Sequence, residues 1–479
     1  MEKKLMKIAT IILLVFSMTL ADFSTIVRAV GPKTQETQEI ETFTSKDELK
    51  NKEESIKLPK LEDIDSLIDS AEEVKQEEDV EKMPPLKFPE IPDINTRSIK
   101  EGNNYPIVLV HGFMGFGRDE LLGYKYWGGA VDLQEKLNVS GHKTYTAAVG
   151  PVSSNWDRAC ELYAYILGGT VDYGEAHSKK FKHNRYGRTY QGIYKNISNE
   201  NKIHLIGHSM GGQTIRTLTQ LLSEGSEEEI NCGQENISPL FEGGKHWIHS
   251  VTTISTPNDG TTLSDLIPAK DLLSYAFGAL GTVTDKNNLF SSLYDLKLDQ
   301  WGLKKKQGES QRDYINRVLE SSIWNNTKDI ATYDLSTKGA KELNTWVKAQ
   351  PDVYYFSWTT QATRESILTG HSVAQIGPMN PIFYIPANLI GKYSRNEKDL
   401  PIIDSKWFPN DGIVNCISQS GPKLGSNDVI GQYNGGAKIG QWNAMPRIIN
   451  TDHMDIVGTF GNVKDWYIEY ANLLSQLSK

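Results

Sequence analysis

A Gly-His-Ser-Met-Gly motif at residues 207–211 constrains the fold most, because it stands between a predicted strand and a predicted helix. Residues 203–206 form a short apolar run, and apolar residues recur at helical spacing over residues 215–222. In such a strand–turn–helix the serine lies at a sharp turn, and the flanking glycines remove side chains that would clash there. The motif predicts an α/β fold with a mostly parallel central sheet and a nucleophilic Ser209.

A second strand signal lies about a hundred residues earlier. The run Tyr-Pro-Ile-Val-Leu-Val at residues 105–110 leads into His-Gly-Phe at residues 111–113. Backbone N–H groups in such a loop, and directly after a nucleophile, can stabilise the oxyanion that forms during acyl transfer. We therefore expect the amides of Phe113 and Met210 to form an oxyanion hole. The alternative is that this loop is only a turn that ends a strand.

A nucleophilic serine needs a histidine as base and an acid that orients the histidine. Among the histidines after Ser209, His453 lies in a polar turn before the last predicted helix, and His371 is the second candidate. The sequence Pro-Asn-Asp-Gly occurs twice and supplies Asp259 and Asp411, both of which suit a turn. Chain order alone leaves both aspartates open as the acid.

The first hundred residues differ in composition from the rest. A short basic segment precedes a thirteen-residue apolar run at residues 8–20, which has the length of a signal peptide and is shorter than the roughly 20 residues of a membrane span. We expect a signal peptide over residues 1–29, with a retained N-terminal helix as the alternative. Residues 30–102 are acidic and contain several prolines, which predicts a disordered pro-region or spacer. One folded domain is expected over residues 103–479.

Charge and cysteine content exclude further classes of protein. Lys and Arg number 51 against 60 Asp and Glu, a net charge of −9, which argues against nucleic-acid binding. The mean hydropathy of −0.45 argues against a protein with several membrane spans. Three cysteines, Cys160, Cys232 and Cys416, cannot build a disulfide scaffold. We expect free thiols, and a Cys232–Cys416 bridge is the alternative.

Several motifs resemble the secreted triacylglycerol lipases of Bacillus, Geobacillus and Staphylococcus over residues 103–479. They include PIVLVHGFMGFGRDELLGYKYWGG, SPLFEGG, YDLKLDQWGL, NDGIVN and DHMDIVG. The resemblance implies an α/β-hydrolase fold with a helical lid and a zinc-binding insertion. It implies a triad of Ser209, Asp411 and His453, with Phe113 and Met210 as the oxyanion-hole donors.

The resemblance also implies two metal sites. The zinc ligands of the family match Asp157, His177, His183 and Asp329, which on their own read as surface residues. Two carboxylates and two neutral imidazoles balance the charge of one Zn²⁺, and four protein ligands leave no position for a catalytic water. We therefore expect a structural zinc ion.

The calcium ligands of the family match Gly377 and Asp455. Phe460 stands where the family has a second aspartate. Because calcium takes six or more oxygen ligands, losing that carboxylate weakens or removes the site.

Residues 260–300 contain a strongly apolar helical stretch, which is a core helix or, by the resemblance, a lid that opens at a lipid surface. The sequence as a whole indicates a secreted triacylglycerol lipase that acts through an acyl-enzyme at a lipid–water interface. No nucleic-acid partner and no stable membrane span are expected. The alternatives are a phospholipase or general carboxylesterase on the same triad, and a catalytically silent secreted zinc-binding or adhesive protein.

Overall fold

The structure, a computed structural model, describes residues 88, 90–91, 102–121, 124–233, 236–283, 294–459 and 461–479. The predicted signal peptide and nearly all of the predicted pro-region lie outside the described residues, so both stay predictions. No described helix combines the length and apolar character that crossing a membrane requires.

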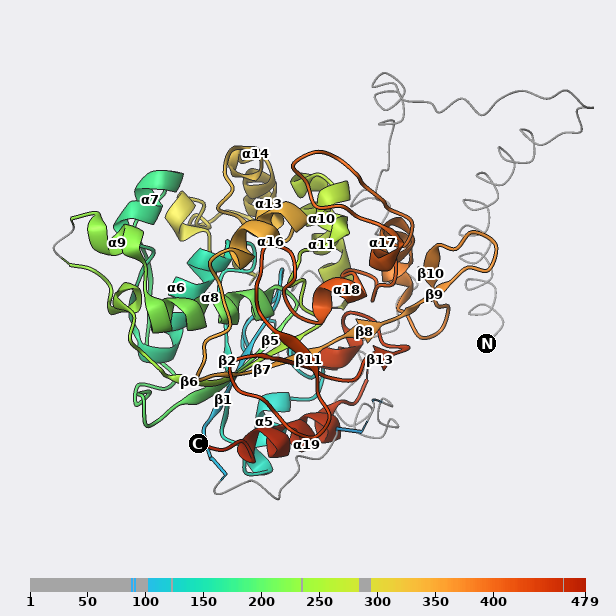
Figure 1. Cartoon of the computed structure of the whole chain (residues 1–479). Helices are drawn as coiled ribbons and strands as arrows, with labels where there is room; N and C mark the ends of the chain where they lie inside the picture. The colour runs from blue at the N-terminus through green and yellow to red at the C-terminus, as the bar shows by residue number, and fades with distance from the viewer. Residues whose placement is uncertain are drawn as a thin grey trace, which may run out of the picture. The chain divides into compact units, whose positions relative to one another are not determined.

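A seven-stranded sheet in which every pair of neighbours runs parallel forms the centre of the protein (Figure 1). This confirms the predicted fold class, and the apolar run before the serine motif forms one of the central strands. In sheet order the strands are β11 (Ile430–Gln432), β12 (Trp442–Ala444), β7 (Tyr354–Trp358), β6 (Ile248–Ile254), β5 (Ile203–His208), β1 (Ile107–Val110) and β2 (Thr144–Ala147).

Helices cover both faces of this sheet. Helices α5 (Leu133–Val139) and α19 (Lys464–Ser475) contact each other on one face, whereas α6 (Asn155–Leu167) and α8 (Met210–Glu224) pack together on the other (Figure 1). Successive side chains of a strand point to opposite faces. In β1 the side chains of Ile107 and Leu109 accordingly join one apolar core, and those of Val108 and Val110 join the second.

Further segments extend from the ends of the strands, and the helices among them lie mostly above the sheet in Figure 1. One of them, α11 (Ala269–Val283), lines the cavity described below, and another is the short hairpin of β3 (Gly169–Asp172) and β4 (Tyr186–Tyr190). The others include α7 (Glu175–Phe181), α9 (Glu227–Asn231), α10 (Thr262–Leu266), α13 (Gln311–Leu319), α14 (Ile323–Asn326), α15 (Ala331–Asp334), α16 (Thr337–Asn344), β8 (Thr360–Gln361), β9 (Thr363–Glu365), β10 (Ser372–Ala374), α17 (Tyr384–Ile390), α18 (Cys416–Gln419) and β13 (Ile448–Ile449).

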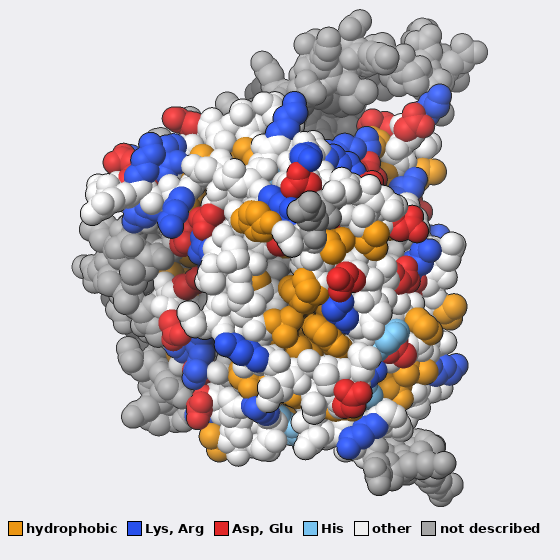
Figure 2. Space-filling model, turned by 90° about the vertical axis from the view of Figure 1, so that its left-hand side faces the viewer, with side chains coloured by type: hydrophobic (Ala, Val, Ile, Leu, Met, Phe, Trp, Pro, Cys, Tyr) orange, Lys and Arg blue, Asp and Glu red, His pale blue; other side chains and the backbone are white. Residues whose placement is uncertain are grey.

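The surface and the cysteines agree with the composition. Figure 2 shows a central group of apolar side chains and several smaller ones on the visible face, among charged and polar residues, and scattered apolar side chains are usual on protein surfaces. Cys160 and Cys416 are buried and Cys232 is exposed, and all three thiols are free. The expectation of free thiols is confirmed, and the alternative Cys232–Cys416 bridge is not formed.

Candidate active site and metal cluster

Ser209 lies at a strained turn between β5 and α8. Its backbone has φ 54° and ψ −131°, a conformation that L-residues rarely adopt. A Cβ added at Gly207 would lie 2.5 Å from the backbone of Gly211, and one added at Gly211 would lie 2.3 Å from the carbonyl oxygen of Val110. The two glycines of the motif are therefore required by packing at the turn.

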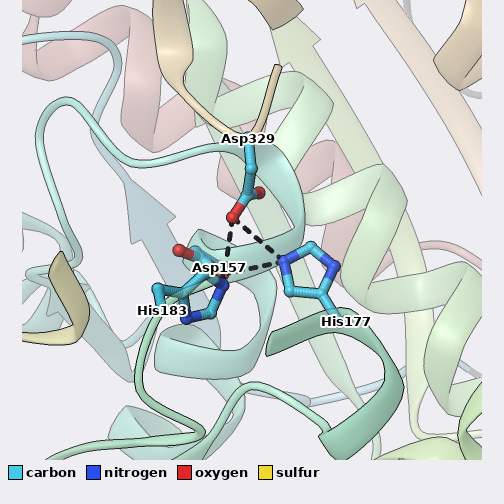
Figure 3. Close-up of side chains that lie close together, drawn as sticks. All are labelled: Asp157, His177, His183 and Asp329. Carbon is cyan, nitrogen blue, oxygen red and sulfur yellow. Dashed lines mark ion pairs between the residues drawn. The ribbon is translucent and has the colours of Figure 1, made fainter. Parts of the chain in front are cut away.

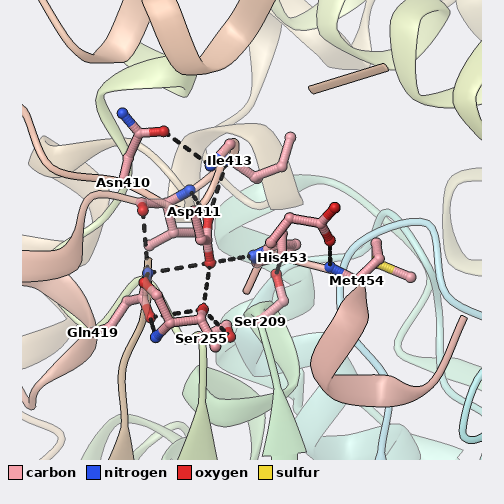
Figure 4. Close-up of polar contacts among 12 residues, drawn as sticks. Ser209, Ser255, Asn410, Asp411, Ile413, Gln419, His453 and Met454 are labelled. Atoms are coloured by element: carbon pink, nitrogen blue, oxygen red, sulfur yellow. Dashed lines mark hydrogen bonds and ion pairs between the residues drawn. The ribbon is translucent and has the colours of Figure 1, made fainter. Parts of the chain in front are cut away.

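The structure brings Ser209, His453 and Asp411 into one hydrogen-bonded line (Figure 4). His453 Nε2 lies 2.9 Å from Ser209 Oγ, and His453 Nδ1 lies 2.9 Å from Asp411 Oδ2. Ser209 and His453 are 6% and 5% exposed, and Asp411 is fully buried. These three side chains can therefore act as nucleophile, base and orienting acid.

Four other groups fix the carboxylate of Asp411. Its Oδ1 accepts the N–H groups of Ile413 at 3.1 Å and Val414 at 2.8 Å. Its Oδ2 accepts the Thr360 hydroxyl at 2.9 Å and the Gln419 side-chain amide at 3.1 Å. The carboxylate is thus held in place on the side away from the histidine (Figure 4).

The other candidates for base and acid have different partners. Asp259 is buried, and its Oδ1 accepts the N–H groups of Lys423 at 2.7 Å and Leu424 at 2.8 Å. His371 packs its ring against Phe408, with 5.6 Å between centroids. Asp259 therefore holds a loop in place.

The loop that carries Phe113 packs directly against the nucleophile. A Cβ added at Gly112 would lie 2.6 Å from Ser209 Cβ. The buried guanidinium of Arg158 donates to the carbonyl oxygen of His111 at 2.5 Å and so anchors the start of this loop. Met210 is the first residue of α8 and belongs to the same apolar cluster as Phe113. The two residues therefore lie close together beside Ser209, and the oxyanion hole stays a prediction.

A mostly apolar cavity of about 150 Å³ opens beside Ser209 and His453. Helix α11 contributes Leu272, Tyr275 and Ala276 to its wall. The Tyr275 hydroxyl also donates to the carbonyl oxygen of Ile382 on the opposite wall. The helical stretch predicted within residues 260–300 therefore covers the cavity, whereas residues 284–293 lie outside the described part of the chain.

The four predicted zinc ligands meet in one buried cluster (Figure 3). Asp157 lies in the first turn of α6, His177 in α7, His183 just after α7, and Asp329 before α15. Their ligand atoms all lie within 4.8 Å of one another. His177 Nε2 is 3.1 Å from Asp329 Oδ2 and 3.3 Å from Asp157 Oδ1, and His183 Nε2 is 3.1 Å from Asp329 Oδ2.

The ligand atoms of this cluster fit a metal ion. One nitrogen or oxygen of each residue is buried and forms ion pairs within the cluster, but no hydrogen bond of ordinary geometry: Asp157 Oδ1, His177 Nε2, His183 Nε2 and Asp329 Oδ2. Buried polar atoms are rarely left unpaired. The Trp156 ring stacks on His177 at 4.8 Å between centroids and 9° between planes, which fixes the imidazole. Four buried ligand atoms within 4.8 Å of one another could hold a metal ion.

Electrostatics explain how the cluster balances its charge without a metal ion. Burial lowers the pKa of His177, but Asp329 and Asp157 outweigh burial and raise that pKa to about 10. Burial raises the pKa of Asp329, but the two histidines outweigh it and hold that pKa well below its ordinary value. A metal ion would therefore have to displace protons from the imidazoles.

The predicted calcium ligands do not form a comparable group. Asp455 Oδ2 accepts the N–H of Asp452 at 2.9 Å, and burial together with Asp452 raises the pKa of Asp455 to about 8. Gly377 is exposed, although Asn380 in the same loop donates its N–H to Asp452 at 2.8 Å. Among the described residues, the group with three or more close metal-ligating side chains is the Asp157 cluster. Phe460 lies outside the described residues, and the calcium site stays a prediction.

Comparisons with known proteins identify the family of this chain. The model of a family described as "Lipase-like, C-terminal domain" matches residues 103–477. Lipase 1 of Staphylococcus aureus strain MRSA252 is 41% identical over 377 residues, which are 76% of this chain and 53% of that protein. The chain thus spans about half the length of the curated relatives that it matches.

Several solved structures are similar to this chain in sequence and in fold. EstA from Clostridium botulinum is 88% identical with a TM-score of 0.86, covering 88% of this chain and 100% of that one. Lipase 1 from Pelosinus fermentans is 55% identical with a TM-score of 0.70, covering 79% and 100%. Staphylococcus hyicus lipase is 36% identical with a TM-score of 0.66, covering 82% and 98%. The expected resemblance is confirmed, and the chain belongs to the lipase-like, C-terminal domain family.

Proposed function

We propose that this protein is a carboxylic ester hydrolase, and more specifically a secreted triacylglycerol lipase. The observation that carries the proposal is the Ser209–His453–Asp411 hydrogen-bonded line at the edge of a mostly apolar cavity. The cavity suits an acyl chain, and the serine lies where the ester carbon of that chain would come.

The mechanism follows from the geometry. Ser209 Oγ attacks the acyl carbon while His453 Nε2 takes its proton, and Asp411 orients and stabilises the imidazolium. The amides of Phe113 and Met210 donate to the oxygen of the tetrahedral intermediate. His453 then gives the proton to the departing glycerol oxygen. Water attacks the acyl-enzyme in the same way and releases the fatty acid.

Helix α11 is proposed to act as a lid. It closes the cavity with Leu272, Tyr275 and Ala276, and Ser209 is only 6% exposed. Substrate entry therefore needs this helix to move, and its apolar face would be exposed as it opens. A lipid surface would cover that face. The hydrolysis rate should therefore rise when a short-chain triglyceride exceeds its solubility limit, and a rate without such a rise would count against the lid.

The proposed metal is a structural Zn²⁺ held by Asp157, His177, His183 and Asp329. The ion would join α6, α7 and the segment before α15, and it takes no part in ester hydrolysis. Export through the N-terminal signal peptide is proposed from the sequence, as is the weakened calcium site at Gly377 and Asp455.

Replacement of the nucleophile tests the proposal. Ser209→Ala should abolish hydrolysis of tributyrin and of p-nitrophenyl butyrate, because it removes the hydroxyl that forms the proposed acyl-enzyme. The matched control is Ser140→Ala, which removes an exposed hydroxyl at the end of α5 and should keep full activity. Full turnover by Ser209→Ala would refute the assignment.

Two measurements separate the alternatives. A panel of triglycerides, soluble esters and a phospholipid distinguishes a lipase from a phospholipase or a general carboxylesterase. A fluorophosphonate label tests the catalytically silent alternative, because a competent triad should be modified at Ser209 and a silent one should not.

A further inference from the structure

One buried chain of hydrogen bonds crosses three loops of the proposed active site. The N–H of Gly112 lies 2.9 Å from the Tyr126 hydroxyl oxygen, which lies 2.6 Å from His208 Nδ1. His208 Nε2 lies 2.8 Å from the backbone carbonyl oxygen of His453. Tyr126 is 5% exposed and His208 is fully buried. These hydrogen bonds therefore connect the loop that carries Phe113 (the oxyanion loop), the turn at Ser209 (the nucleophile turn) and the proposed base, His453.

The direction of these hydrogen bonds follows from the backbone carbonyl oxygen of His453, which can only accept. Since the carbonyl oxygen of His453 accepts, His208 carries its proton on Nε2 and accepts at Nδ1. Tyr126 then donates its hydroxyl proton to Nδ1, and its oxygen accepts the N–H of Gly112. Burial and the nearby His453 lower the pKa of His208 well below its ordinary value, which keeps its ring neutral. Each polar group in the chain thus has a partner.

We propose that Tyr126 and His208 are positioning residues that hold the base in register with the nucleophile and the oxyanion loop. The backbone of His453 is held from both sides, because its N–H donates to the Asp411 carbonyl oxygen at 3.0 Å and its carbonyl accepts from His208. The catalytic consequence rests on the proposed ester hydrolysis, in which the imidazole must reach Ser209.

Close packing makes this position sensitive to small shifts. A Cβ added at Gly112 would lie 3.0 Å from the Tyr126 hydroxyl and 2.6 Å from Ser209 Cβ. The ring centroids of His208 and His453 are 4.7 Å apart. Because these groups are in direct contact, a displacement of Tyr126 or His208 should shift the nucleophile, the base and the oxyanion loop together.

Removal of the Tyr126 hydroxyl tests the proposal on soluble p-nitrophenyl butyrate. Tyr126→Phe leaves the N–H of Gly112 and His208 Nδ1 unpaired, and it should lower kcat by about 10- to 100-fold while KM changes by less than about twofold. The control is Tyr470→Phe, which removes a buried hydroxyl that bonds Thr252 at 2.8 Å. The control should lose stability and keep kcat, because this hydroxyl belongs to no loop of the site.

A pair of substitutions at His208 separates positioning from packing. In His208→Gln the side-chain amide can still donate to the His453 carbonyl, so kcat should stay within about fivefold of the wild type. His208→Leu fills similar space without a donor and should lose kcat as Tyr126→Phe does. Wild-type kcat in both Tyr126→Phe and His208→Leu, or a change in KM alone, would overturn the proposal.

A structural readout keeps this test independent of the proposed function. If the wild-type protein hydrolyses no ester, the proposed function fails, and a crystal structure of Tyr126→Phe then decides the positioning role. A separation of Ser209 Oγ and His453 Nε2 beyond hydrogen-bonding distance supports the role. An unchanged 2.9 Å distance overturns it.

Discussion

Removal of the metal ion should cost this protein a measurable part of its stability. A ligand present at about 1,000 times its dissociation constant stabilises the folded state by about 4 kcal/mol. The matched domain has about 375 residues, and unfolding entropy is about 2.1 cal/mol/K per residue, or about 0.8 kcal/mol/K in total. Dividing this stabilising free energy by the unfolding entropy predicts a fall in Tm of about 5 °C on chelation.

The assay combines metal analysis with thermal unfolding. The purified protein should contain close to one zinc ion, and chelation should lower Tm in a way that added zinc reverses. His177→Ala should remove the response to the chelator. The matched control is His246→Ala, which removes a half-exposed imidazole 3.1 Å from Asp352 and should keep the full response.

Proton release provides a second measurement of the same event. Because the pKa of His177 is raised to about 10 in the metal-free cluster, metal uptake near neutral pH should release a proton from this ring. Calorimetry in buffers of different ionisation enthalpy measures that release. A protein without near-stoichiometric metal, whose melting ignores the chelator, would refute the reasoning.

Three further predictions concern the oxyanion loop, pH and the thiols. Gly112→Ala should lower kcat by about 100-fold, because the new Cβ would lie 2.6 Å from Ser209 Cβ. In the control Gly436→Ala the new Cβ would contact nothing within 4 Å, so kcat should be kept. Equal activity of the two variants would contradict the packing argument. Burial lowers the pKa of His111, His204 and His208 well below the ordinary value. Below about pH 6.5 the unfolded state therefore binds more protons than the folded state, and each ring lowers the free energy of unfolding by about 1.4 kcal/mol per pH unit. Urea unfolding at pH 7.5, 6.5 and 5.5 should show this loss, and an unchanged pH dependence in His204→Asn would exclude that ring as a source. A thiol reagent should modify Cys232 alone in the native protein and all three cysteines after denaturation, and rapid native reaction of Cys160 or Cys416 would show that their burial is wrong.

Local sequence was enough to predict the strand–turn–helix around Ser209 and the fold class. The strand, glycines and helix around Ser209 are short-range signals, and each acts within a few residues of the serine. The acid was different, because Asp259 and Asp411 lie in the same four-residue turn sequence. What separates them is the tertiary structure: the carboxylate of Asp411 faces His453, whereas that of Asp259 accepts backbone N–H groups of another loop.

Several functional contacts had no local signal. Thr360 and Gln419 hold the carboxylate of Asp411 from two different elements, and no spacing rule relates them to it. The metal ligands come from three separate segments, so the residues alone indicated surface positions for them. The roles of Tyr126 and His208 also depend on a contact between residues 82 positions apart in the chain.

The strand order has a consequence for biosynthesis. The nucleophile follows β5, which pairs with β1 and β6, whereas Asp411 and His453 lie on either side of the segment that forms β11 and β12. A chain emerging from the ribosome carries the complete serine turn long before its base and acid exist. Large chains often fold through partly structured states. The proposed ester hydrolysis should therefore begin only after the segment that carries β11, β12 and His453 has joined the sheet, later than the serine turn itself can form.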